Sequence, residues 1–146
     1  MKRIYISMLL VAAIMAGCSR NSARQDKAEA EATTAFTYEG IIPAADSNGI
    51  KYTVTMTPAS AEDGTFVMEQ TPVKEGARAF SSKGFYEEFT DTIVTPGRKY
   101  YRLISTVGSD TTYFVVTSNN TVILTDASLM PAPSGLDYTL TLKGSR

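Results

Sequence analysis

An alternating stretch at residues 50–57 constrains the fold more than any other feature of the sequence. It reads IKYTVTMT, so an extended chain here carries apolar side chains on one face and polar side chains on the other. The apolar set is Ile50, Tyr52, Val54 and Met56. Because side chains alternate across a β-strand, this period of two predicts a strand with one buried face. The turn-forming cluster at residues 43–49 predicts a tight polar connection into that strand.

Short segments rich in threonine, valine and tyrosine continue the pattern to the end of the chain. We expect strands at 36–42, 50–57, 65–71, 83–90, 91–95, 99–106, 111–117, 121–126 and 136–143. Turn-forming pairs, such as Asp63-Gly64 and Pro96-Gly97, separate these segments. Since nearly every link is short, each strand is expected to pair with the next one in sequence. The sequence therefore predicts an all-β fold, a small antiparallel up-and-down β-barrel of about eight strands.

Aromatic side chains on these strands are the candidates for the interior of the barrel. Those expected to point inward are Tyr52, Phe66, Phe85, Phe89, Tyr101, Phe114 and Tyr138. A small barrel is usually filled by its own side chains, so we expect these residues to pack as a core. If a lumen stays open, its expected lining as a ligand cavity is Tyr52, Phe66, Tyr101, Phe114 and Tyr138.

The first 18 residues, MKRIYISMLLVAAIMAGC, have the organisation of an export signal. Two basic residues precede an apolar run at residues 4–14, which is shorter than the roughly 20 residues that a membrane-spanning helix needs. Residues 14–18 resemble the lipobox of bacterial lipoproteins, in which the cysteine carries acyl chains. We therefore expect a signal peptide at residues 1–17 and lipidation at Cys18. Ser19, rather than an aspartate, favours the outer membrane.

After Cys18, the segment up to residue 35 contains no apolar side chain larger than alanine. Ordering such a segment would cost conformational entropy without burying apolar surface in return. We expect residues 18–35 to be a flexible tether between the lipid and one domain at residues 36–146. An arm that binds a specific partner is the alternative interpretation of this segment.

The residue inventory excludes several kinds of chemistry. The chain has no histidine and one cysteine, which excludes a histidine-based triad, an imidazole metal site and a disulfide within the chain. Met56, Met68 and Met130 are a conceivable set of Cu(I) ligands, but packing in the core explains them better. With 14 basic and 15 acidic residues, the chain lacks the charge of a nucleic-acid-binding protein. We expect no catalytic site, no metal site and no cofactor.

The lipobox, the tether and the stretch from Tyr38 to Ile50 resemble the NlpE family of outer-membrane lipoproteins. The family motif reads approximately Y-x-G-x-L-P-C-A-D-C-x-G-I, followed by an alternating strand and a D-G-T-[YF] hairpin. Matching positions are Tyr38, Gly40, Pro43, Ala45, Asp46, Gly49 and Ile50, and then Asp63, Gly64, Thr65 and Phe66. The two motif cysteines fall on Ala44 and Ser47. Because neither residue can bind copper through a thiol or form a disulfide, the copper-resistance and redox roles of the family are not expected here.

The resemblance implies a lipocalin-like β-barrel at residues 36–143. The motif residues with an implied structural role are Tyr38, Gly40, Pro43, Asp46 and Gly49. The implied function is that of an outer-membrane-anchored, non-enzymatic lipoprotein with an envelope-stress or interaction role. Its implied partners are the membrane, through the acyl chains, and an envelope protein. A lipocalin-like binder of a small apolar ligand is the alternative, and an inhibitor of a surface hydrolase, acting through the loop at residues 131–135, is a third interpretation.

Overall fold

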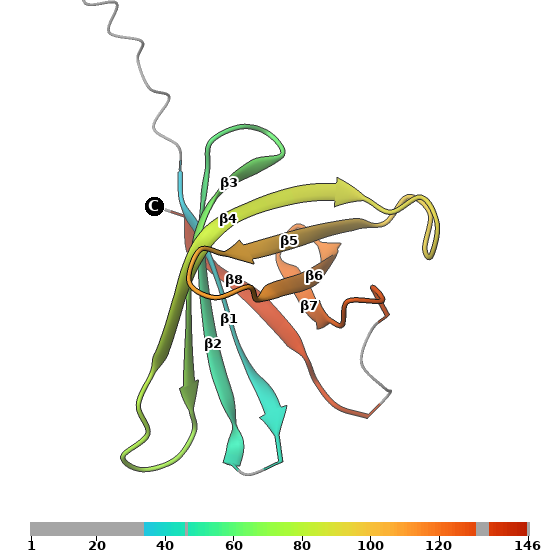
Figure 1. Ribbon diagram of the computed structural model, residues 1–146. Coiled ribbons are helices and arrows are strands. Elements are labelled where there is room, and N and C mark those ends of the chain that lie inside the picture. The colour runs from blue at the N-terminus through green and yellow to red at the C-terminus, as the bar shows by residue number, and fades with distance from the viewer. Residues whose placement is uncertain (1–33, 46, 131–134, 146) are drawn as a thin grey trace, which may run out of the picture. The chain divides into compact units, whose positions relative to one another are not determined.

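The computed structural model describes residues 34–45, 47–130 and 135–145. The expected signal peptide, Cys18, most of the expected tether, Asp46 and most of the loop at 131–135 lie outside these ranges. Within them the chain is made of β-strands joined by turns and loops (Figure 1).

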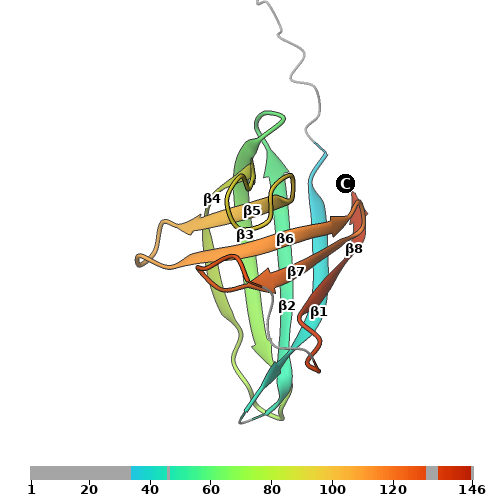
Figure 2. The ribbon, with the colours of Figure 1, turned by 90° about the vertical axis from the view of Figure 1, so that its right-hand side faces the viewer.

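The strands are β1 (Phe36–Ala44), β2 (Ser47–Pro58), β3 (Asp63–Pro72), β4 (Phe80–Thr90), β5 (Lys99–Ser105), β6 (Thr111–Ser118), β7 (Thr121–Thr125) and β8 (Thr139–Ser145). Each strand pairs antiparallel with the next one in sequence, and β8 pairs with β1 to close the barrel. Figures 1 and 2 show β5, β6 and β7 running across the direction of β1, β2 and β3, while β4 bends from one direction into the other and runs alongside β5. The predicted all-β up-and-down barrel is confirmed.

Alternation along the strands fills the interior of the barrel. In β2, Val54 and Met56 are buried, whereas Lys51 and Thr57, whose side chains point to the other face, are exposed, as the period of two predicted. The buried core consists of Tyr38, Ile42, Val54, Met56, Phe66, Met68, Tyr86, Leu103, Phe114, Val122 and Leu140. Fully burying an aliphatic or aromatic side chain contributes roughly 1.5–3 kcal/mol, so this core dominates the stability of the fold.

One end of the barrel, here called the closed end, is filled by four aromatic rings. The rings belong to Phe36, Tyr38, Tyr86 and Tyr101. The Phe36 and Tyr38 rings meet edge to face at 5.8 Å, and the Tyr86 and Tyr101 rings do so at 5.9 Å. Edge-to-face contact is the arrangement that aromatic quadrupoles prefer, so these rings both seal and stabilise this end.

The other end, here called the open end, is wider because neighbouring strands stop at different levels. Pairing of β4 with β5 ends at Gly84 and Ser105, whereas pairing of β4 with β3 continues to Phe80. On the opposite side, β8 pairs with β1 only as far as Glu39, whereas β1 and β2 stay paired to Ala44. The β1–β2 and β3–β4 hairpins therefore project as two arms, which Figures 1 and 2 show at the bottom.

The segment at residues 91–95, predicted as a short strand, is instead part of the turn between β4 and β5. The Asp91 carboxylate accepts hydrogen bonds from the backbone N–H groups of Ile93 (2.9 Å), Val94 (3.2 Å) and Thr95. An aspartate side chain that binds nearby N–H groups competes with strand pairing, and here the local bonds win.

The predicted turn at Asp63-Gly64 is also wrong, because both residues lie inside β3. The chain reverses one step earlier, at residues 59–62, where the Ser60 hydroxyl accepts from the N–H groups of Glu62 and Asp63 at 3.2 Å. Gly64 allows close packing around β3 and is not part of a turn. A Cβ at this position would lie 2.2 Å from the carbonyl oxygen of Thr57 and 2.6 Å from the Tyr86 ring.

The predicted inward direction of Phe85 and Phe89 is wrong as well. Gly84 and Tyr86 are the buried residues of this part of β4, so Phe85 points outward and is 60% exposed. Phe89 is half-buried, lies on the face of β4 opposite to Tyr86, and stacks on the fully buried Tyr100, with ring centroids 5.6 Å apart. β4 carries aromatic residues on both faces, and alternation alone does not say which face is inside.

Candidate functional site at the open end

The open end contains a hollow of about 530 Å³ between the β3–β4 arm and the β5–β6 segment. It is lined by Phe66, Met68, Gln70, Phe80, Ser81, Ser82, Leu103, Ser105, Val107, Asp110, Thr111 and Thr112. Three of these residues, Phe66, Met68 and Leu103, belong to the buried core and form an apolar floor. Polar residues from β3, β4 and β6 surround that floor. Such a hollow has the size of a ligand site and a composition that fits one apolar group with polar surroundings.

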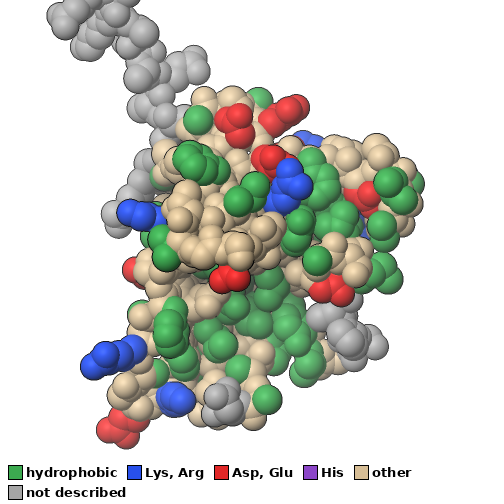
Figure 3. Space-filling view, viewed as in Figure 1, with side chains coloured by type: hydrophobic (Ala, Val, Ile, Leu, Met, Phe, Trp, Pro, Cys, Tyr) green, Lys and Arg blue, Asp and Glu red, His purple; other side chains and the backbone are tan. Residues whose placement is uncertain are grey.

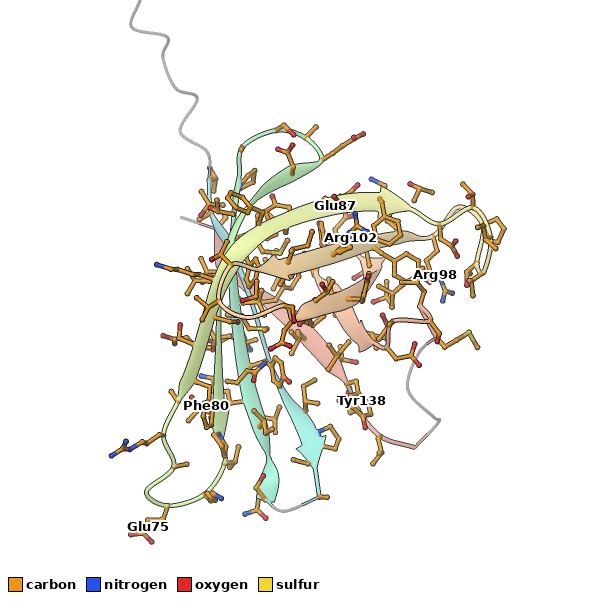
Figure 4. The ribbon with its side chains drawn as sticks, viewed as in Figure 1. Glu75, Phe80, Glu87, Arg98, Arg102 and Tyr138 are labelled. Atoms are coloured by element: carbon orange, nitrogen blue, oxygen red, sulfur yellow. The ribbon has the colours of Figure 1, made fainter. Side chains whose placement is uncertain are left out.

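Exposed apolar surface marks the open end from outside. Figure 3 shows hydrophobic side chains gathered over the lower parts of β1, β2 and β8. Figure 4 shows Phe80 on the β3–β4 arm and Tyr138 on the opposite side of the opening, just before β8. Phe80 is 67% exposed, although it belongs to the same side of β4 as the buried Tyr86. An inward-side aromatic left open to solvent is unusual and points to this end as the site.

The five residues expected to line a ligand cavity are only partly brought to this hollow. Phe66 lines it, and Phe114 is buried in the core. The other three, Tyr52, Tyr101 and Tyr138, pack against the core as half-buried side chains. The hollow is instead lined largely by residues that the sequence analysis did not select, among them Phe80, Ser82 and Ser105. These residues line the hollow because β5 ends before it reaches them. The turn at residues 108–110 is the only feature of the sequence that indicates where β5 ends.

A stretch of backbone beside the hollow, residues 80–83 of β4, pairs with a strand on one side only. We call it the open edge. At its inner limit, the carbonyl oxygen of Lys83 accepts hydrogen bonds from the N–H and the hydroxyl of Thr106, at 2.9 and 3.0 Å. Beyond that point, β3 continues on one side, and no strand of the described chain continues on the other.

Three of the described motif residues, Gly40, Pro43 and Gly49, lie on the β1–β2 arm, whereas Tyr38 lies at the closed end. Tyr38 is in the closed-end cluster, and Gly40 leaves room for β8, since a Cβ there would lie 2.3 Å from the carbonyl oxygen of Thr139. Gly49 has φ of 115°, a backbone conformation that favours glycine. Pro43 is half-buried near the tip of β1, and Asp46 lies outside the described residues.

The positions of the two missing motif cysteines face each other. Ala44 and Ser47 are register partners across the hairpin, one on each strand. The Ser47 hydroxyl donates to the carbonyl oxygen of Gly49 at 2.9 Å and so stays within its own turn. At this place the chain carries a methyl group and a hydroxyl group, which have no redox chemistry and little affinity for copper.

Electrostatics at the closed end keep its tyrosines neutral. Burial raises the pKa of Tyr86 to about 12, and burial also raises the pKa values of Tyr38 and Tyr101 above the ordinary tyrosine value. The Glu88 carboxylate raises the same three pKa values further, and it pairs with Lys99 at 2.5 Å. Tyrosines with raised pKa values stay neutral near neutral pH, which fits rings that fill the closed end.

Metal ligands are scarce in the part of the chain that the structure describes. It contains no group of three or more histidine, cysteine, aspartate or glutamate side chains that could hold a metal ion. Of the three methionines considered for Cu(I), Met56 and Met68 are buried in the core, whereas Met130 is 53% exposed in the loop after β7. Core packing therefore accounts for two of the three.

In the same described ranges, no helix has the length and apolar character needed to cross a membrane.

Comparison with known proteins gives the following relations. No curated protein matches the chain. A solved structure, that of a candidate lipoprotein from Shewanella oneidensis, matches with a TM-score of 0.53 and 22% sequence identity, over 74% of this chain and 87% of that one. At this identity the likeness concerns the fold. The NlpE N-terminal domain family matches residues 38–135, which is more than half of the 146 residues. The chain therefore belongs to the NlpE N-terminal domain family.

Proposed function

We propose that this protein is a lipid-anchored, non-enzymatic lipoprotein of the outer membrane, which acts by binding another envelope component at the open end of its barrel. The observation that carries the proposal is the combination of a hollow of about 530 Å³ and an open strand edge at the same end. Asp110 is the one ionisable side chain that lines the hollow. Among the described residues no hydroxyl of the hollow is hydrogen-bonded to the Asp110 carboxylate, so no nucleophile is paired with a base, and the site is suited to binding rather than to catalysis.

The anchor is supported by the N-terminal sequence and by the family. A short apolar run followed by small residues and Cys18 is the pattern of a lipoprotein signal. The Shewanella oneidensis structure that shares the fold is that of a candidate lipoprotein. Each buried CH₂ of an acyl chain contributes about 0.8 kcal/mol, so two or three chains would hold the domain at the membrane almost permanently.

Lipidation and sorting are tested together by labelling and fractionation. Cells grown with radioactive palmitate should label the natural chain, and the Cys18→Ser variant should remain unlabelled and leave the membrane fraction. The Ser19→Asp variant should keep its label but move to the inner membrane. Retention of label by Cys18→Ser would contradict the anchor, and outer-membrane retention of Ser19→Asp would contradict the sorting signal.

Interaction with an envelope component is tested by recovering the intact lipidated protein from envelope extracts and comparing it with a soluble Cys18→Ser form. A partner that contacts the barrel should be recovered with both forms, more efficiently with the anchored one. Substitution at the open end, such as Phe80→Ser, should reduce recovery, whereas Phe85→Ser on the outer face should not. Recovery that depends on the anchor alone would contradict a binding role for the barrel.

A second candidate function, binding of a small apolar ligand, is favoured by the apolar floor of Phe66, Met68 and Leu103. A fluorescent apolar probe such as N-phenyl-1-naphthylamine should then bind the natural chain. Ser82→Phe, which fills the hollow, should abolish binding of the probe. Lys83→Phe places the same ring on the exposed side of the same strand and is the matched control. Equal probe binding by both variants would rule this function out.

A further inference from the structure

We infer that the open edge of β4 is a peptide-binding site, at which an extended segment of a partner protein adds to the sheet and places one apolar side chain in the hollow. The inference rests on the proposed function, which assigns binding to the open end, and it names the chemical class of the partner.

The backbone of the open edge offers hydrogen-bonding groups to a new strand. The Lys83 carbonyl points toward the β5 side, where it accepts from Thr106 at 2.9 Å. Backbone groups of alternate residues in an antiparallel strand point to the same side, so the N–H and carbonyl of Ser81 also point to that side. β5 has ended before it reaches Ser81, and no described strand takes its place there. A donor and an acceptor are thus presented in the geometry that β-strand addition uses.

The hollow lies where the side chains of an added strand would reach. Neighbouring strands are about 4.8 Å apart, so a peptide paired with residues 80–83 would run between β4 and the residues that begin β6. Ser81 and Ser82 line the hollow from β4, and Thr111 and Thr112 line it from β6. Every second side chain of the peptide would point to the floor formed by core residues, and the exposed ring of Phe80 would pack beside it. This geometry selects an apolar residue at one position of the peptide.

Charge adds a second element of selectivity. Asp110 is the one ionisable residue among the described residues that line the hollow, and within the described part of the chain its carboxylate forms no hydrogen bond or ion pair. Its backbone carbonyl accepts from the N–H of Ser105 at 3.0 Å, which fixes the loop on the rim. A lysine or arginine close to the apolar residue of the peptide would complement this carboxylate. The class of ligand is therefore an extended peptide with neighbouring apolar and basic residues.

The second arm shows how an open edge is protected in the same barrel. β1 also continues beyond its pairing with β8, but Pro43 stands in this part and has no N–H to donate. Proline on an edge strand is one of the means by which proteins prevent unwanted strand pairing. Residues 80–83 contain no proline. The two arms thus differ in the feature that decides whether a strand can add, and β4 is the available one.

The test uses the full chain, purified in detergent, and a phage-displayed library of random ten-residue peptides. Peptides with neighbouring apolar and basic residues should be enriched. Ser81→Pro removes the donor of the open edge, and Ser81→Ala removes only the hydroxyl. Ser81→Pro loses one backbone hydrogen bond and leaves its partner unpaired, so the affinity for selected peptides should fall by about tenfold. In Ser81→Ala the affinity should fall by less than about twofold. Circular dichroism and thermal melting verify that both variants are folded.

N-methylated versions of one selected peptide give a test that is independent of the protein variants. Methyl groups on alternate amides that face β4 should abolish binding, whereas methyl groups on the intervening amides should not. Equal loss in the two series, equal binding by the two Ser81 variants, or a library without binders would overturn the inference. The inference would also be overturned if the selected peptides bind only when two copies of this chain form a dimer, because the edge would then serve self-association. If Cys18-dependent anchoring and recovery of a partner persist in that case, the proposed function stands without this inference.

Discussion

At the scale of the residue, burial decides the behaviour of the tyrosines at the closed end. Tyr38 and Tyr86 are 4% and 5% exposed, and their rings meet those of Phe36 and Tyr101. Removal from water penalises the charged phenolate, which is why burial is the largest cause of each raised pKa. The cluster therefore makes the stability of the barrel depend on pH in the alkaline range.

The pH dependence of stability follows from the sign of that shift. Tyr86 has an ordinary value of 10.0 and a pKa of about 12 in the fold, so the unfolded chain loses its proton first. The contribution of Tyr86 to stability should be fully present below pH 10 and should fall as the pH rises from 10 toward 12. Denaturant unfolding at a series of pH values measures this loss. Tyr86→Phe should make the decline shallower, and an unchanged decline in that variant would contradict the assignment.

Asp91 orders the turn between β4 and β5 through its carboxylate, which is bound by backbone N–H groups of residues 93–95. These bonds lower the pKa of Asp91, so their contribution is present above the ordinary value of 3.8 and is lost as the pH falls below it. Asp91→Ala should speed amide exchange of Ile93 and Val94, measured by NMR. Asp91→Asn keeps one acceptor and should have a smaller effect. Slow exchange in both variants would show that other contacts order the turn.

At the scale of the element, glycines set how closely neighbouring strands approach aromatic rings and carbonyl groups. Gly84 is the clearest example, because a Cβ would lie 2.0 Å from the carbonyl oxygen of Ile104 and 3.1 Å from the Phe66 ring. The Phe66 ring thus covers a position in β4 that no side chain can share. The same residue forms part of the floor of the hollow, so Gly84 connects the packing of β4 with the candidate site.

Gly84→Ala should therefore destabilise the protein by about 1–3 kcal/mol, the usual cost of overpacking a tight site. Gly144→Ala, in the paired part of β8, is the control, because nothing lies within 4 Å of a Cβ there. Urea unfolding measures both variants. Similar stability of the two variants would mean that β4 and β5 separate easily at this point.

The β1–β2 hairpin gives a test of the motif positions that lack cysteine. Ala44 and Ser47 are register partners, and directly opposite residues in antiparallel strands have Cα atoms about 4.5–5.5 Å apart, within the range that a disulfide accepts. The Ala44→Cys, Ser47→Cys double variant should form an intramolecular disulfide under oxidising conditions. Mass spectrometry of unreduced peptides detects it. The Ala44→Cys single variant is the control, and free thiols in the double variant would contradict the register.

Strand faces and turns are predictable from the sequence at some positions of this chain and not at others. The alternation at residues 50–57 predicted the inner face of β2 because only one of its faces is apolar. The segment containing Phe85 and Tyr86 has aromatic residues on both faces, and the choice between them depends on Gly84, whose contacts come from β5 and β3. Asp63-Gly64 has the composition of a turn, but both residues lie in β3, where Gly64 leaves room for the Tyr86 ring.

At the scale of the molecule, short connections made the order of strands predictable. Each link joins neighbours, and the one pairing between distant parts of the chain is that of β1 with β8. The open end was not predictable in this way. It depends on strands of different length, such as β4 with residues 80–90 and β5 with residues 99–105, and their ends are set by bonds such as those of Thr106 to Lys83.

The difference between the two ends should appear in hydrogen exchange of the backbone. Amide groups in the middle of β2, near Val54, are bonded to strands on both sides and lie under the core, so they should exchange slowest. The Ser81 amide at the open edge should exchange much faster, by at least about 100-fold, since its N–H points away from β3 to the side on which β4 has no strand partner. Exchange of the intact chain followed by NMR measures this gradient. Equal protection at the two sites would mean that the open edge is covered in solution.

The pairing of β1 with β8 brings the beginning and the end of the barrel's chain together. Phe36 and Ser145 are register partners at the closed end, so the first and last strands of the barrel end side by side (Figure 1). A few glycine and serine residues would span that distance, and the exposed reversals at residues 59–62 and 106–110 offer places to open new termini. The barrel is thus suited to circular permutation, through which the point of attachment could be moved from β1 to another strand without a change in the pairing of the sheet.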